Sequence, residues 1–340
     1  MTIDSLEIQE YMLSKGYTKE DLKELFNNTT LTTVKKETLL TKLKENYELL
    51  TEIGFRPNEI VKISKTLPNL YNYSITNLKD KVKNFQELDY TKQDIIKMTK
   101  ILPALLSYSI ENIKQKRTDL INLGYTEKDI NKITKAFPSI YAYSIEYIKK
   151  KINDLIELGY TKEEIINKTK RFPALFGLEI NNIKQKINDL IELGYTKEEV
   201  LKLTKSLPTL YGLSTKYIKQ KIEDLMSFGY SKQEALNMTK QLPTLLGLKK
   251  ENIKQKINFY KATNLDFIIL EDTKKLMQSI DLTYARFMYL KEQGQELNKR
   301  NYSKLFYGEQ IFEKSYKIKK EELLTKYPYT KQEYIKKKEK

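Results

Sequence analysis

Residues 159–196, GYTKEEIINKTKRFPALFGLEINNIKQKINDLIELGYT, contain one complete copy of a pattern that recurs through the middle of the chain. A proline falls every 35 residues without insertion or deletion, at Pro68, Pro103, Pro138, Pro173, Pro208 and Pro243. A period of roughly 20–50 residues is typical of stacked supersecondary units, none of which buries its apolar face alone. The period therefore predicts a solenoid whose function lies on a surface rather than in one pocket.

The first half of the copy predicts a short helix. Thr161 and Glu164 have the spacing of a capping box at a helix start. Pro173 ends this helix after about ten residues, because its ring disfavours the helical conformation of the residue before it. The apolar segment 174–178 is too short for another full helix, and we expect a 3₁₀ turn there.

The second half predicts a longer amphipathic helix. Its expected core stripe consists of Ile183, Ile187, Leu190 and Ile191, and Gly194 is placed to close the helix. The sequence shows no strand pattern. We therefore expect an all-α fold, an α-solenoid of 35-residue helix-turn-helix units with a short 3₁₀ turn after each repeat proline, stacked into a curved superhelix.

The period also predicts how the chain is organised. We expect a degenerate N-terminal cap at 1–49, six repeats at 50–258, divergent C-terminal cap repeats at 259–313 and a basic tail at 314–340. Atypical terminal repeats are usual in solenoids, because the outer face of the last unit has no neighbour. The tail contains ten lysines and four glutamates.

The amino-acid composition narrows the classes of function that the chain can have. Lys and Arg total 61 against 45 Asp and Glu, a formal net charge of +16, which favours a polyanionic partner. The chain has no histidine and no cysteine, hence no imidazole base, thiol nucleophile or disulfide, and it has no phosphate-binding glycine loop. We therefore expect no enzyme activity, no cofactor and no metal site.

The chain also lacks a long apolar run and a visible transit peptide, so no membrane association is expected. The interpretation is an intracellular monomer, cytoplasmic if bacterial or viral and otherwise in an organellar matrix.

Lysines recur at three fixed positions of the unit. The first lysine row lies three residues before each proline, at Lys65, Lys100, Lys135, Lys170, Lys205 and Lys240. The second lysine row lies early in the longer helix, at Lys79, Lys114, Lys149, Lys184, Lys219 and Lys254. The third lysine row follows it two residues later, at Lys81, Lys116, Lys151, Lys186, Lys221 and Lys256.

Two interpretations stay open for the first row, whose charges suit a helix C-terminus but would also form a basic stripe. The second and third rows lie where the helix dipole opposes positive charge, so helix stability does not explain them. All three rows are candidates for phosphate contacts with nucleic acid.

The signature SLPTLYGLS-x-x-x-IKQKI-x-x-LMSFGYSKQE at 206–234 resembles the repeat of the mitochondrial transcription termination factor (mTERF) family, and the resemblance covers about residues 50–295. The final family segment is similar to SIDLTYARFMYLKEQG, which adds Arg286 to the candidate nucleic-acid-binding residues. The resemblance implies a superhelix whose basic concave groove holds double-stranded DNA or structured RNA, and a role in transcription termination or regulation.

The alternative is a protein-protein interaction scaffold with no nucleic-acid partner. Repeat surfaces bind proteins as readily, and acidic patches on a partner protein would meet the same lysines.

Overall fold

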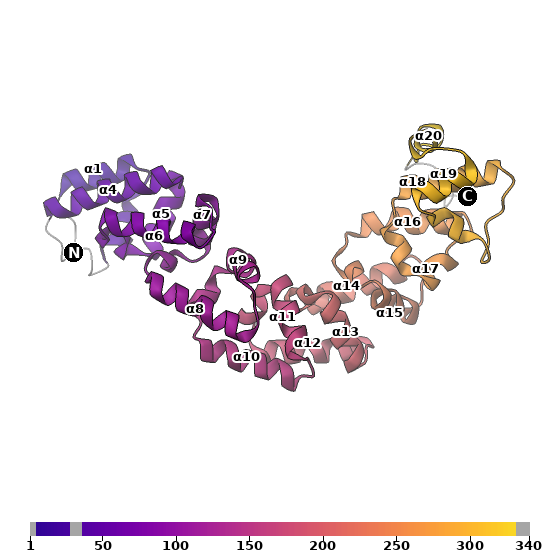
Figure 1. Ribbon diagram of the computed structural model, residues 1–340, viewed down its shortest axis with the longest axis horizontal. Helices are drawn as coiled ribbons and strands as arrows, with labels where there is room; N and C mark the ends of the chain where they lie inside the picture. The colour runs from indigo at the N-terminus through magenta and orange to yellow at the C-terminus, as the bar shows by residue number, and fades with distance from the viewer. Residues whose placement is uncertain (1–4, 28–35, 331–340) are drawn as a thin grey trace. The chain divides into compact units, whose positions relative to one another are not determined.

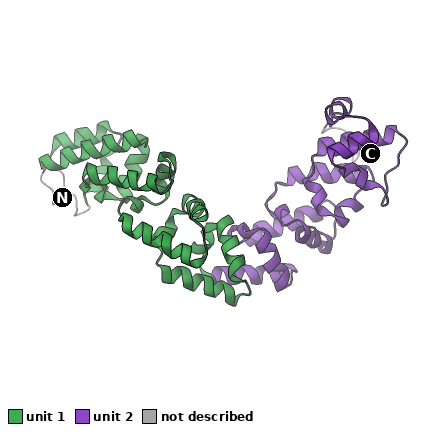
Figure 2. Ribbon diagram, in the orientation of Figure 1, with its two compact units in different colours: residues 1–180 green, residues 181–340 purple. Residues whose placement is uncertain are grey.

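The computed structural model of the chain describes residues 5–27 and 36–330, and the regular structure of these residues is entirely helical (Figure 1). The chain divides into two compact units, residues 1–180 and 181–340 (Figure 2). The predicted all-α repeat fold is confirmed. Among the described residues, no helix combines the length and the apolarity needed to cross a membrane.

Unit 1 opens with α1 (Leu6–Ser14) and then alternates short and long helices. The short first helices are α2 (Lys19–Phe26), α5 (Pro57–Thr66), α7 (Lys92–Ile101), α9 (Glu127–Ala136) and α11 (Lys162–Arg171). The 3₁₀ turns are η1 (Pro68–Asn72), η2 (Pro103–Leu106), η3 (Pro138–Ala142) and η4 (Pro173–Gly177). The second helices are α4 (Lys36–Ile53), α6 (Ile75–Glu87), α8 (Ile110–Leu123) and α10 (Ile145–Glu157).

Unit 2 continues the same alternation from α12 (Ile180–Leu193), which begins at the division. Its other second helices are α14 (Thr215–Met226), α16 (Lys250–Ala262) and α18 (Ile280–Glu292). Its first helices are α13 (Lys197–Ser206), α15 (Lys232–Gln241) and α17 (Phe267–Glu271), followed by the turns η5 (Pro208–Gly212), η6 (Pro243–Gly247) and η7 (Thr273–Met277). The chain then forms η8 (Tyr302–Phe306), α19 (Glu309–Tyr316) and α20 (Lys320–Lys326).

The helices begin and end where the sequence predicts. The predicted reciprocal capping boxes start first helices at Thr91/Asp94, Thr126/Asp129, Thr161/Glu164, Thr196/Glu199 and Ser231/Glu234, and Thr18/Asp21 starts α2 in the same way. Each repeat proline starts a 3₁₀ turn, and the residue before it leaves the helical conformation, as Leu102 does with φ −129° and ψ 83°. Gly124, at the end of α8, has a φ of 110°, which glycine adopts without strain.

Buried hydroxyl pairs connect neighbouring repeats inside the core. Tyr125 and Thr169 are hydrogen-bonded at 2.6 Å between their side-chain oxygens, and the same pair recurs as Tyr90–Thr134 and Tyr195–Thr239. In the N-terminal segment, Tyr17 bonds to Ser64 in the same way at 2.7 Å. Each pair satisfies two buried polar groups at once, which fixes the stacking of one repeat on the next.

One predicted core residue is exposed. Ile183, Ile187 and Leu190 are buried, whereas Ile191 is 39% exposed, so its assignment to the core is wrong. Eight residues advance about 80° beyond Ile183 around a helix, which brings Ile191 to the edge of the apolar stripe. The equivalent side chains of the neighbouring repeats are exposed to a similar extent: Ile121, Ile156 and Met226.

The C-terminal part departs from the period. First helix α17 has only five residues where α15 has ten, and Thr273 takes the place of a repeat proline at the start of η7. Within the predicted tail, α20 packs against α18, and Lys326 pairs with Glu292 at 2.9 Å. Residues 1–4 and 28–35 of the predicted N-terminal cap and 331–340 of the tail lie outside the described residues.

Candidate nucleic-acid interface

The second lysine row lies on the exposed face of the second helices. In unit 1 the row consists of Lys79 on α6, Lys114 on α8 and Lys149 on α10, and all three are exposed. In unit 2 it consists of Lys184 on α12, Lys219 on α14 and Lys254 on α16, again all exposed. Each repeat therefore presents one lysine of this row to solvent at the same position.

These exposed lysines have few protein partners. Within the described part of the chain, Lys219 has a carboxylate at 4.0 Å, that of Glu223 one helical turn later, and the other five lysines of the row form no ion pair. Pairs between exposed side chains contribute little to stability. The ammonium groups of the row are therefore available to an external anion.

The first lysine row is used at the boundaries between repeats. Its lysines reach back to the capping-box carboxylate of the preceding first helix, which lies 44 residues earlier for Lys65 and 41 residues earlier for Lys100 and Lys240. We call these contacts the boundary ion pairs; they include Lys65–Asp21 at 2.7 Å, Lys100–Glu59 at 2.6 Å, Lys135–Asp94 at 2.8 Å, Lys170–Asp129 at 2.9 Å and Lys240–Glu199 at 2.8 Å. Lys205 occupies the same position on α13 and is exposed.

The boundary ion pairs change the acidity of their carboxylates. The Lys65 hydrogen bond holds the pKa of Asp21 at about 2, below its ordinary 3.8. Hydrogen bonds from Arg56 and then Lys100 bring the pKa of Glu59 down to about 2 from 4.5. These carboxylates are therefore ionised throughout the neutral range and bind the lysines as charge-assisted hydrogen-bond partners.

The third lysine row points inward and binds the next repeat. Lys151 is 3% exposed, and its ammonium donates to the carbonyl oxygen of Leu178, just after η4. Lys81 and Lys116 donate in the same way to the carbonyls of Tyr108 and Tyr143. Each of these carbonyls lies where a 3₁₀ turn has ended, so a lysine supplies the donor that the backbone lacks.

The row keeps this role in unit 2 with different acceptors. Lys186 donates to Thr215 Oγ1 at 2.8 Å, and Lys256 donates to the carbonyls of Leu276 at 2.6 Å and Gln278 at 2.8 Å. The ammonium of Lys221 lies 4.9 Å from the centre of the Tyr217 ring. Burial lowers the pKa of Lys81, Lys116, Lys151, Lys186 and Lys256, as expected for ammonium groups withdrawn from water.

Helix geometry explains why the second and third rows separate. Residues two apart on an α-helix point about 200° apart, so Lys149 and Lys151 cannot share a face. From the sequence alone, both rows were predicted to contact phosphates. The sequence does contain a signal that distinguishes them: Lys151 is three residues after the buried Ile148 and four before the buried Leu155, so it lies beside both, whereas Lys149 lies about 100° around the helix from Ile148.

Arg286 is enclosed by the C-terminal helices. It is 4% exposed, and its Nη1 donates to the carbonyls of Leu305 at 3.0 Å and Tyr307 at 2.6 Å. Its guanidinium carbon lies 4.5 Å from the centre of the Phe312 ring, and burial lowers its pKa. These contacts connect α18 to the segment that follows η8, and we leave Arg286 out of the interface proposed below.

Comparison with known proteins agrees with the repeat architecture. A family model described as mTERF matches residues 6–158 and 147–268. These two matches together cover most of the chain and include all six repeat prolines. No curated protein gave a significant match.

Proposed function

The chain belongs to the mTERF family, whose members bind nucleic acids, and we propose that it holds duplex DNA, or structured RNA, through the second lysine row. The observation that carries the proposal is the repeated exposure of this row. Six lysines occupy one position of six second helices and are exposed, while the described lysines of the third row are committed to contacts within the fold.

The proposed mode of binding is contact with phosphates. Lysine ammonium groups neutralise phosphates without distinguishing base sequence. Bidentate readout of guanine is the usual task of arginine, and two of the five arginines, Arg117 and Arg286, are buried in contacts with protein groups. The lysines would thus provide affinity and orientation rather than base readout.

The proposed biological role is regulation of transcription, including its termination. A non-enzymatic repeat protein bound along a duplex acts by occupancy, because it obstructs a polymerase or competes with another protein for the same segment. Family membership is the support for this role.

The test is a charge reversal of the row. The variant Lys114→Glu, Lys149→Glu, Lys184→Glu, Lys219→Glu should bind a duplex at least ~100-fold more weakly, because four phosphate contacts become repulsive. For the unaltered protein, six contacts predict a slope of about −5 for log K against log salt concentration. Fluorescence anisotropy with duplex DNA, single-stranded DNA and hairpin RNA would measure both quantities.

A second variant with the same charge change is the control. Lys92, Lys162, Lys197 and Lys232 are exposed at the start of first helices, and their replacement by Glu also lowers the net charge from +16 to +8. This control should retain most of the affinity. Equal losses in both variants would show that net charge alone, and not the second lysine row, governs binding.

One observation favours the scaffold as a second candidate. The exposed apolar positions Ile121, Ile156, Ile191 and Met226 recur at one place on four second helices, seven residues after a lysine of the second row. Repeated exposed apolar side chains are typical of protein-binding surfaces. A protein that binds none of the three nucleic acids at physiological salt would favour this function.

A further inference from the structure

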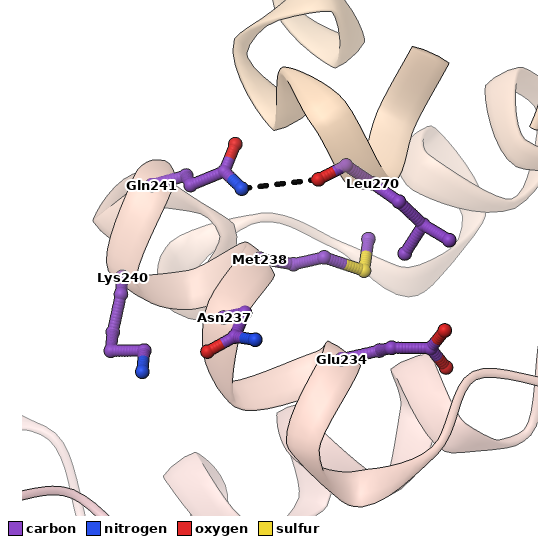
Figure 3. Close-up of a pocket in the computed structure, with 6 residues that line it drawn as sticks. All are labelled: Glu234, Asn237, Met238, Lys240, Gln241 and Leu270. Atoms are coloured by element: carbon purple, nitrogen blue, oxygen red, sulfur yellow. Dashed lines mark hydrogen bonds between the residues drawn. The ribbon is translucent and has the colours of Figure 1, made fainter. Parts of the chain in front are cut away.

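A hollow of about 420 Å³ lies beside α15, where the repeat has lost part of its next first helix. The hollow is lined by Glu234, Asn237, Met238, Lys240, Gln241 and Leu270 (Figure 3). Elsewhere a ten-residue first helix packs against the preceding one, as α7 does against α5. The five-residue α17 also packs against α15, and the hollow lies beside these two helices.

A boundary ion pair is also missing here, because the position of its lysine holds a leucine. Thr273 lies 30 residues after Pro243 and takes the place of the repeat proline in the next repeat. By the same offset of 30 residues, Leu270 occupies the position that Lys240 has in the repeat before it. Glu234 is the capping-box carboxylate of α15, the type of group that binds a lysine at the other boundaries. Figure 3 shows that the Glu234 and Leu270 side chains border the same space.

The carboxylate of Glu234 keeps binding capacity after its capping contacts. Its Oε2 accepts from the backbone nitrogen of Ser231 at 2.7 Å and from the Ser231 hydroxyl at 2.9 Å. No ion pair within 4.0 Å reaches Glu234 from the described residues, although the charge of Lys261 is near enough to lower its pKa, and Oε1 makes no hydrogen bond to the described residues. The backbone hydrogen bond from Ser231 lowers the pKa of Glu234, so the carboxylate is charged at neutral pH.

The other polar groups of the hollow are already engaged in the fold. Lys240 pairs with Glu199 at 2.8 Å. Gln241 donates to the Leu270 carbonyl at 3.2 Å and accepts from the Thr273 backbone nitrogen at 2.9 Å, which fixes α17 and η7 to the end of α15 (Figure 3). Met238 and Leu270 form the apolar part of the wall of the hollow.

We propose that this hollow binds a primary ammonium group on an aliphatic stem, which restores the missing boundary ion pair from outside the chain. The ammonium binds Glu234, beside the Asn237 amide, and the stem lies against Met238 and Leu270. The ligand is either a lysine side chain presented by a partner protein or a free diamine. This site is separate from the second lysine row and does not depend on nucleic-acid binding.

The chain contains its own reference position for a test by methyl NMR. Met98 on α7 is the equivalent of Met238, but beside it Asp94 is already paired with Lys135. Titration with N-acetyl-lysine N-methylamide should shift the Met238 methyl resonance saturably and leave that of Met98 in place. The norleucine analogue, which has the same stem without the ammonium, should shift neither.

Two substitutions test whether Glu234 binds the ammonium group. Glu234→Gln keeps a residue suited to a capping box but removes the charge, and Leu270→Lys supplies the ammonium from within the chain. Each should weaken binding of the lysine probe on the order of tenfold or more. In Glu234→Gln the charge-assisted contact is lost, and in Leu270→Lys the carboxylate is already occupied. Thermal unfolding followed by circular dichroism would verify that both variants are folded, because Met98 lies in unit 1 and reports only on its own repeat.

A titration with 1,5-diaminopentane distinguishes the two sources of ligand. Tighter binding of the diamine than of the blocked lysine would identify a free diamine, and the reverse order would identify a partner's lysine. The proposal fails if the Met238 shift persists in Glu234→Gln, if the norleucine analogue produces it, or if no probe shifts Met238.

Discussion

Phe55 shows what a single hydroxyl contributes to the repeat. It occupies the position that Tyr90 and Tyr125 hold in later repeats, and Thr99 occupies that of Thr134 and Thr169. Because phenylalanine has no hydroxyl, Thr99 Oγ1 is buried without a hydrogen-bond partner among the described residues. An unsatisfied buried hydroxyl is a local defect in stability that the neighbouring repeats do not have.

Phe55→Tyr should correct this defect. The new hydroxyl would bond to Thr99 and raise the free energy of unfolding by about 1 kcal/mol. The reverse change, Tyr125→Phe, should lower it by a similar amount, because Thr169 loses its partner. Urea unfolding followed by circular dichroism measures both. A destabilising Phe55→Tyr would mean that the core has no space for the oxygen.

On the scale of the helix, α10 carries two lysines with different surroundings. Lys149 is exposed, whereas Lys151 is buried and donates to the Leu178 carbonyl of the next repeat. Lys151→Met should lower the free energy of unfolding by about 1–3 kcal/mol, because the buried carbonyl loses its donor. Lys149→Met should change it by less than about 0.5 kcal/mol and should instead weaken duplex binding.

The two measurements are complementary. Thermal unfolding and duplex anisotropy on both variants should give opposite rankings. If Lys149→Met proved the more destabilising change, the assignment of the two helix faces would be contradicted.

The helices also show what the sequence could predict and what it could not. Capping boxes, proline stops and the glycine at Gly124 depend on residues a few positions apart, so helix bounds followed from local rules. The boundary ion pairs join residues 41 or 44 apart, such as Lys100 and Glu59 or Lys65 and Asp21, and depend on how one helix stacks on the next. Local patterns carry no such information. The candidate interface was therefore predicted as three equivalent lysine rows, of which only the second is uniformly exposed.

For the whole molecule, the boundary ion pairs make stability depend on pH. The pKa values of Asp21 and Glu59 are about 2 in the folded protein, below their ordinary 3.8 and 4.5. Those of Asp94, Asp129 and Glu199 are also lowered; burial opposes the shift at the two aspartates, while their lysine partners produce it. A carboxylate with a lowered folded pKa takes up its proton more readily in the unfolded chain.

The stability that these carboxylates provide is thus complete above about pH 5 and is lost as the pH falls towards 2. The urea midpoint should decrease steadily over this interval and change little between pH 6 and 8. The double variant Asp21→Asn, Glu59→Gln should show a lower midpoint at pH 7 and a shallower decrease in acid. A midpoint that does not respond to acid would contradict a stabilising role of these pairs.

Three kinds of contact join one repeat to the next. The hydroxyl pair Tyr125–Thr169 spans 44 residues, the boundary ion pair Lys100–Glu59 spans 41, and the lysine–carbonyl contact Lys81–Tyr108 spans 27. None of these three bonds skips a repeat. Removing or duplicating one 35-residue segment therefore recreates the same junction on both sides of the cut. The chain can change in length by whole repeats without new contacts having to arise, and each added repeat brings one further exposed lysine of the second row with it.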